Sequence, residues 1–230
     1  MRGTQSFALG GGAIPVRPTL LAGLLAAEAT LVLLYFVTNS GVLPGALGHR
    51  LGVLFDLDAE QSVGAWFSAS QLLVIGLTLW SASERMGGAD QPAPWFLRLA
   101  GAGFVFLSAD EAAAVHEALS RAVYKASPSV APFGHEHSAW VVVYGVAAFL
   151  LVAFFWPQVK RFWRAFPAPS ALGLAGAAVL LAGATGLESL GYLHVFMGHV
   201  EVALEETLEM VGATLMLLAA LAVKDAAGRS

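Results

Sequence analysis

Residues 200–223 read VEVALEETLEMVGATLMLLAALAV, and this stretch decides the fold. At about 1.5 Å per residue, it is long enough to cross the roughly 30 Å hydrocarbon core of a bilayer as one helix. Its second half carries no charged residue, whereas its first half carries acidic residues at intervals of four. The stretch therefore predicts a transmembrane helix that is acidic along one face of one half.

The rest of the chain repeats the apolar pattern. Of its 230 residues, 57% are hydrophobic and 12% are charged, whereas a soluble domain carries about 25% charged residues. An ordinary water-soluble domain is therefore excluded, and apolar runs separated by Gly and Pro predict an all-α polytopic membrane helix bundle. The six expected transmembrane helices are 19–37, 62–82, 95–123, 138–156, 170–192 and 200–223. An N-terminal segment, 1–18, and a tail, 224–230, flank this transmembrane domain, 19–223.

Orientation follows from the Lys and Arg residues of the short loops, which concentrate on the cytoplasmic side of a membrane. With the N-terminus inside, nine such residues lie on the inner side and three, Arg50, Arg121 and Lys125, on the outer side. We therefore expect both termini in the cytoplasm and the protein in the bacterial inner membrane. A formal charge of −4 without a basic run argues against a nucleic-acid partner.

Carboxylates inside the predicted spans are the most informative feature. Each costs about 3 kcal/mol to insert, and no Lys or Arg lies deep in any span to neutralise them. Protons, hydrogen bonds, histidines or bound cations must therefore compensate them. For Glu28 in the first span, we expect a partner in Ser70, Gln71 or another helix. The eight residues are Glu28, Asp110, Glu111, Glu117, Glu188, Glu205, Glu206 and Glu209.

Helical spacing brings these groups together. In a continuous third helix, Asp110 and Glu117 share one face, with Glu111 and His116 on either side. In the sixth helix, Glu201, Glu205 and Glu209 recur at i, i+4 and i+8, and Glu188 enters from the fifth. We predict one acidic cavity that opens outward, on the side where all six histidines also fall. Small residues in the fifth helix predict a close helix contact: Gly173, Gly176, Gly183, Ala184 and Gly186.

The chemistry of the predicted cavity suits a divalent metal. The chain has no cysteine, so a metal site must use carboxylates and imidazoles, which suit Zn, Fe or Mn. The expected ligands are His116, Glu117, Glu188, Glu205 and Glu209, with Asp110 or Glu111 as the catalytic base. The acids in Asp56-Leu57-Asp58-Ala59-Glu60 are expected to cap the following helix.

Three stretches resemble a family of bacterial integral membrane proteins with six helices and no established activity. They are 55–70, which contains Trp66-Phe67-Ser68, then 108–117, and 204–212. This resemblance implies the six-helix architecture and no particular reaction. A fainter likeness is to the membrane metal-hydrolase superfamily that includes alkaline ceramidases, which uses Ser, Asp and three His in seven helices. This chain departs from that pattern because it has no His-x-x-x-His pair.

Three functions are compatible with these features. The first is a metal-dependent membrane enzyme that acts on a lipid or another apolar substrate, with the metal activating water or oxygen. The second is a cation or proton-coupled transporter that uses the same acids as a relay. The third is a non-catalytic membrane scaffold whose acids stay protonated.

Overall fold

The computed structural model describes residues 6–9, 12–15, 17–88, 90–132, 135–193 and 198–228. Within them the chain is helical apart from a short antiparallel hairpin of β1 (Ser6–Leu9) and β2 (Gly12–Pro15), which contacts α8. The first helices are α1 (Pro18–Asn39), α2 (Gly45–Leu54), α3 (Val63–Ser83), α4 (Pro94–Ala113), α5 (Val115–Ala126) and η1 (Pro128–Val130). They are followed by α6 (Ala139–Phe154), α7 (Trp156–Ala165), α8 (Pro167–Leu181), the π-helical η3 (Ala182–Leu187), α9 (Glu188–Tyr192) and α10 (His199–Ala227).

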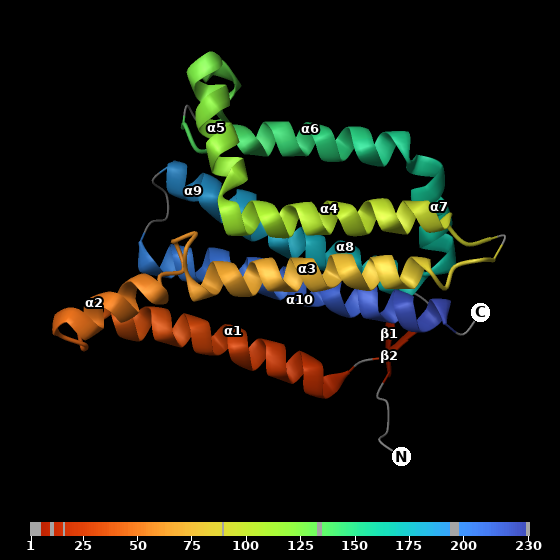
Figure 1. Ribbon diagram of the computed structural model, residues 1–230, viewed down its shortest axis with the longest axis horizontal. Helices are drawn as coiled ribbons and strands as arrows, with labels where there is room; N and C mark the ends of the chain where they lie inside the picture. Colours follow the sequence, from red (N-terminus) through yellow and green to blue (C-terminus); the bar gives the residue numbers. More distant parts are fainter. Residues whose placement is uncertain are drawn as a thin grey trace.

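The long helices lie side by side in a layered bundle, with α10 next to α1, α3 and α8 (Figure 1). Among the described residues, four helical segments are long and apolar enough to cross a membrane: α1, α3, Pro167–Gly191 and α10. The pair α6 and α7 forms a fifth candidate, interrupted by a bend of 75°. The all-α membrane fold is thus supported, with four to five candidate spans where the sequence predicts six.

The third expected helix, 95–123, is not continuous. It divides into α4 and α5 at Ala114, which has a left-handed backbone with φ 50°. A left-handed alanine costs about 1–2 kcal/mol, and the Asp110 carboxylate offsets this cost by accepting a hydrogen bond of 2.7 Å from the His116 backbone N–H. The prediction that Asp110 and Glu117 share one face of a single helix is therefore wrong. α5 turns away from the bundle (Figure 1).

The fourth expected helix, 138–156, also ends earlier than predicted. α6 stops at Phe154, and Pro157 stands in the first turn of α7. Proline cannot donate an intrahelical hydrogen bond and clashes with the preceding turn, so a new helix direction begins here. α7 has exposed Lys160, Arg161 and Arg164, and it packs through Phe162 and Ala165 against a buried cluster of the bundle.

Close glycine contacts hold the central helices together. A Cβ atom on Gly176 of α8 would lie 2.7 Å from the Gly212 carbonyl oxygen of α10, and one on Gly183 would lie 2.7 Å from the Glu205 carbonyl oxygen. The close approach predicted for the fifth span is therefore confirmed at Gly176 and Gly183, whereas a Cβ atom on Gly186 would meet nothing within 4 Å. Gly76 of α3 and Gly101 of α4 make a reciprocal contact of the same kind.

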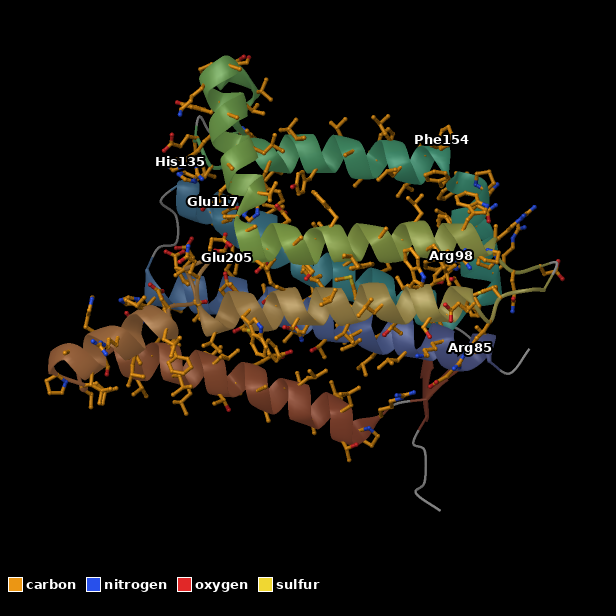
Figure 2. The ribbon with its side chains drawn as sticks, in the orientation of Figure 1. Arg85, Arg98, Glu117, His135, Phe154 and Glu205 are labelled. Carbon is orange, nitrogen blue, oxygen red and sulfur yellow. The ribbon has the colours of Figure 1, made fainter. Side chains whose placement is uncertain are left out.

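The two ends of the bundle differ in charge. Glu117, His135 and Glu205 lie near one end, and Arg85 and Arg98 lie near the other (Figure 2). At the second end, Arg17 before α1 donates to both carboxylate oxygens of Asp225 in α10, at 2.9 and 3.0 Å. The start of α1 and the end of α10 are therefore together. We call these the acidic end and the basic end.

Candidate functional site

A cavity of about 240 Å³ lies toward the acidic end of the bundle. It is surrounded by the loop before α3 and by α3, α4, α5, α6, α8, α9 and α10. Nine carboxylic acids and one histidine line it, together with leucines and two aromatic residues, and no Lys or Arg is among its lining residues. The nine acids and the histidine are Asp58, Glu60, Asp110, Glu111, His116, Glu117, Glu188, Glu205, Glu206 and Glu209.

All seven residues predicted to form the site line this cavity. Asp110 and Glu111 come from the last turn of α4, and His116 and Glu117 from the first turn of α5. Glu188 begins α9, and Glu205 and Glu209 lie one turn apart in α10. The predicted convergence of three parts of the chain is present, although a helix break rather than one helix face brings the α5 residues to it.

Asp58 and Glu60 are cavity residues that the sequence reasoning assigned to helix capping. That assignment is wrong: Ser62 is the N-cap of α3, and its side chain accepts a hydrogen bond of 3.1 Å from the Ala65 backbone N–H. The acids are thus free to face α5. Their alternation, Asp-x-Asp-x-Glu, next to a predicted span was the available signal.

Two aromatic residues of α6, Trp140 and Tyr144, also line the cavity and were not predicted. The Trp140 ring packs edge-on against the His116 imidazole, with 5.6 Å between ring centroids, and against Tyr144 at 5.9 Å. Trp140 also donates its backbone N–H to the buried Ser120 hydroxyl of α5, at 2.8 Å. α6 thus supplies an aromatic wall, which no pattern in the sequence marked.

His116 is held between carboxylates from two elements. Its Nδ1 lies 3.5 Å from Asp110 Oδ2, and its Nε2 lies 3.7 Å from Glu60 Oε1. Burial lowers the pKa of His116, but the hydrogen bond and charge of Asp110, with the nearby carboxylates, outweigh it and raise the pKa above 6.5. The surrounding carboxylates therefore stabilise the protonated form of the imidazole relative to the neutral form.

The loop carboxylates are shifted toward their neutral forms. Burial is the largest cause that raises the pKa of Asp58 above 3.8, and the charges of Asp56 and Glu117 add to it. Burial also raises the pKa of Glu60 above 4.5, although the imidazole of His116 opposes the shift. Crowding of acids and removal from water act in the same direction here.

Glu117 has a cationic partner outside the cavity. Its Oε2 accepts a hydrogen bond of 2.8 Å from Arg121, one turn along α5, and its Oε1 lies 3.8 Å from His137 Nδ1. Glu117 therefore belongs to the rim of the site. Its predicted role as a metal ligand requires that a metal replace or share this arginine contact.

A second cavity of about 410 Å³ adjoins the first. Six residues line both, and His135, His137 and Glu201 are added at the outer one. The two cavities form a path that leads from the acidic end into the bundle. Of the other histidines, His199 bonds to Tyr35 at 2.9 Å, and His194 lies outside the described residues.

The described residues contain no cluster of three or more His, Asp or Glu side chains positioned to hold a metal ion. The imidazole–carboxylate separations of 3.5–3.8 Å are those of ion pairs. A metal would require side-chain rotation within the cavity.

The profile of one protein family, described as "Domain of unknown function (DUF8692)", matches residues 22–224. This match covers every helix from α1 to most of α10. No curated protein and no solved structure gives a significant match.

Proposed function

The chain belongs to the family described as Domain of unknown function DUF8692, and we propose, from its acidic cavity, that it is a metal-dependent membrane enzyme. In this proposal a divalent cation, Zn, Fe or Mn, binds in the cavity from the acidic end. The substrate is a lipid or another apolar molecule.

One observation carries the proposal: nine carboxylic acids surround a small cavity, and its described lining residues include one histidine but no Lys or Arg. If every acid of the candidate spans were ionised, at about 3 kcal/mol each, the sum would exceed the whole stability of about 5–15 kcal/mol. Protons or a cation must therefore compensate most of the charge. A divalent cation replaces two protons at once and attracts all the surrounding oxygens.

Because the cavity is reached from one end only in this proposal, it suits a binding site better than a pathway for ions across the membrane. Beyond the cavity, buried apolar layers fill the bundle toward the basic end, with Leu72, Ile75 and Leu217 in one cluster and Leu97 and Val223 in another. A cation that enters between the acids meets this apolar floor. A site that is closed on one side suits chemistry on a bound substrate.

The cavity offers ligands and a base from different elements. Glu188, Glu205 and Glu209 would supply carboxylate ligands, with His116 and Glu117 near the rim. Asp110 and Glu111, in the last turn of α4, would accept a proton from a water that the metal activates. The aromatic wall and the leucines give an apolar substrate a surface to bind.

We also propose six membrane spans with both termini in the cytoplasm. α4 is the third span, and α6 is the fourth. The basic residues at the basic end, including Arg85 and Arg98, would face the cytoplasm under the positive-inside rule. The cavity would then open to the outer side of the inner membrane.

A proton or cation relay is the second candidate function. The observation that favours it is the separation of the acids, since no three of the described His, Asp and Glu side chains are grouped as metal ligands. In that case the carboxyl groups would exchange protons instead of holding a metal.

Elemental analysis of the purified protein tests the proposal. We expect a stoichiometric divalent metal that is lost in Glu205→Gln and in Glu209→Gln. The matched control is Glu84→Gln, which changes an exposed glutamate at the far end of α3 and should retain the metal. Metal-free wild type after incubation with Zn, Fe and Mn would overturn the metal site. Proton flux into vesicles by that metal-free protein would support the relay.

A further inference from the structure

Glu28 is a buried acid that the cavity does not include. It lies at the middle of α1, its residue is 2% exposed, and its neighbours belong to α3 and α10. The Thr214 hydroxyl of α10 donates to Glu28 Oε1 at 2.6 Å, and the Gln71 amide of α3 donates to the same oxygen at 3.3 Å. Gln71 Nε2 also donates to Thr214 Oγ1 at 2.8 Å. Three helices therefore meet at one carboxyl group.

Two oxygens at this point have no partner. Glu28 Oε2 and Gln71 Oε1 are buried and form no hydrogen bond within the described part of the chain. Gln71 is itself 4% exposed. A buried group without a hydrogen-bond partner costs about 1–3 kcal/mol, so this group of atoms requires a donor or a cation.

Within the described residues, no basic side chain is bonded to this group. α3 carries no charged residue, and the nearest acid of α10 toward the acidic end is Glu209, five residues or about 7.5 Å along the helix from Thr214. In the other direction Lys224 and Asp225 are about 15 Å or more along the helix, and Asp225 is bonded to Arg17. The ligand must therefore be a small cation that is not part of the protein's side chains.

Apolar layers isolate the group on both sides. Toward the acidic end, Leu31 and Met210 belong to one buried cluster, and Met210 is 0% exposed. Toward the basic end, Ile75 and Leu217 belong to a second cluster, with Leu24 packed against it. Met210 lies one turn from both Glu206 and Thr214 in α10, so it separates the cavity from Glu28.

We propose that Glu28 is an intramembrane proton-binding site, distinct from the acidic cavity, in which the carboxyl group carries a proton at neutral pH. A single proton on Oε2 converts an unpartnered acceptor into a donor and removes the uncompensated charge. Gln71 Oε1 is part of the same side-chain amide whose Nε2 donates to Glu28 Oε1. A hard metal ion such as Mg²⁺ or Ca²⁺ takes six or more oxygens, which exceeds the two unpartnered oxygens, Glu28 Oε2 and Gln71 Oε1.

Infrared spectroscopy of the full-length protein in lipid bilayers tests this proposal, because a protonated carboxyl group has a C=O band that a carboxylate lacks. We expect Glu28→Gln to lose one such band at neutral pH, while the control Glu84→Gln loses only carboxylate absorption. Loss of carboxylate absorption in Glu28→Gln, with no change in the acid bands, would overturn the proposal. Metal content is a separate readout and should be unchanged in Glu28→Gln.

Thr214 provides a second test that keeps the acid in place. Its hydroxyl donates to the oxygen that becomes the carbonyl of the protonated group, so Thr214→Val should shift the acid band to higher frequency. Thr214→Ser keeps the hydroxyl and should leave the band in place. An unshifted band in Thr214→Val would contradict the assignment to Glu28.

Exchange into D₂O tests the separation from the cavity. The Glu28 band should shift slowly in the wild type and several-fold faster in Met210→Ala, which opens the layer between the two sites. Met86→Ala, in the buried cluster near the basic end that also contains Leu97 and Val223, is the matched control and should exchange as slowly as the wild type. Equal rates in all three proteins would show that Met210 does not isolate this site.

Discussion

Replacing Gly101 with alanine should weaken the contact that positions α4. A Cβ atom at Gly101 would lie 2.7 Å from the Gly76 carbonyl oxygen and 3.3 Å from the Trp80 backbone nitrogen, both in α3. These are backbone atoms, which cannot rotate away as a side chain can. The two helices must therefore separate or slide to admit the methyl group.

The same helix offers a matched control in Gly103, whose added Cβ would meet nothing within 4 Å. Both substitutions gain about 1 kcal/mol from the higher helix propensity of alanine. Only Gly101→Ala incurs an overpacking cost, which is typically about 1–3 kcal/mol. The difference in the free energy of unfolding between the two variants should therefore be about 1–3 kcal/mol, with Gly103→Ala the more stable.

Chemical unfolding in detergent micelles, followed by tryptophan fluorescence, measures this difference. Gly76→Ala should behave like Gly101→Ala, because its Cβ would lie 2.7 Å from the Gly101 carbonyl oxygen. The movement of α4 away from α3 should also displace the cavity residue Asp110. Ser108, two residues before it, is hydrogen-bonded to the Ala69 carbonyl oxygen of α3. Equal stabilities of the Gly101 and Gly103 variants would refute the close approach of α3 and α4.

Three further outcomes concern the break between α4 and α5. Asp110→Ala removes the acceptor for the His116 backbone N–H and should lower the free energy of unfolding by about 1 kcal/mol, with faster amide hydrogen exchange at the start of α5. Ala114→Gly relieves a left-handed alanine and should raise the free energy of unfolding by up to about 1 kcal/mol in denaturant titrations. Because the pKa of His116 is raised above 6.5, its stabilising effect is complete below pH 6.5 and is lost as the pH rises through the folded-state value. The melting temperature of the wild type should therefore exceed that of His116→Gln at pH 6 by more than at pH 9, and a constant difference would contradict the raised pKa.

Apolar length predicted most of the helices, because a span must satisfy its backbone hydrogen bonds internally. The expected segments 19–37, 62–82 and 200–223 correspond closely to α1, α3 and α10. The expected segment 95–123 failed at Ala114, because alanine is a strong helix former and gives no local signal of a break. The bend after α6 was easier to predict from the sequence, because Pro157 stands there and the following segment, α7, is basic.

The composition of the candidate site was predictable for a different reason. Acids at helical spacing in an apolar chain must gather away from lipid, and this argument brought Asp110, Glu188 and Glu209 to one cavity. This argument did not identify the cavity residues that come from loops or from weakly packed helices. Asp58 reaches the cavity through loop geometry, and Trp140 through the placement of α6, neither of which follows from periodicity.

α10 explains why the protein keeps two acidic sites apart. Along it, Glu205, Glu206 and Glu209 line the cavity, then Met210 lies in a buried apolar cluster, and Thr214 is the next polar residue toward the basic end. An acid that lines the cavity has space beside it for water or a cation, whereas Glu28, within the described residues, accepts hydrogen bonds from Thr214 and Gln71 alone. The proposed metal or proton exchange therefore belongs to the cavity, and tight retention of one proton belongs to the deeper site. A Met210→Glu variant would place an acid between them and should speed exchange at the deeper site several-fold; an unchanged rate would mean that the two sites are not aligned along this face of α10.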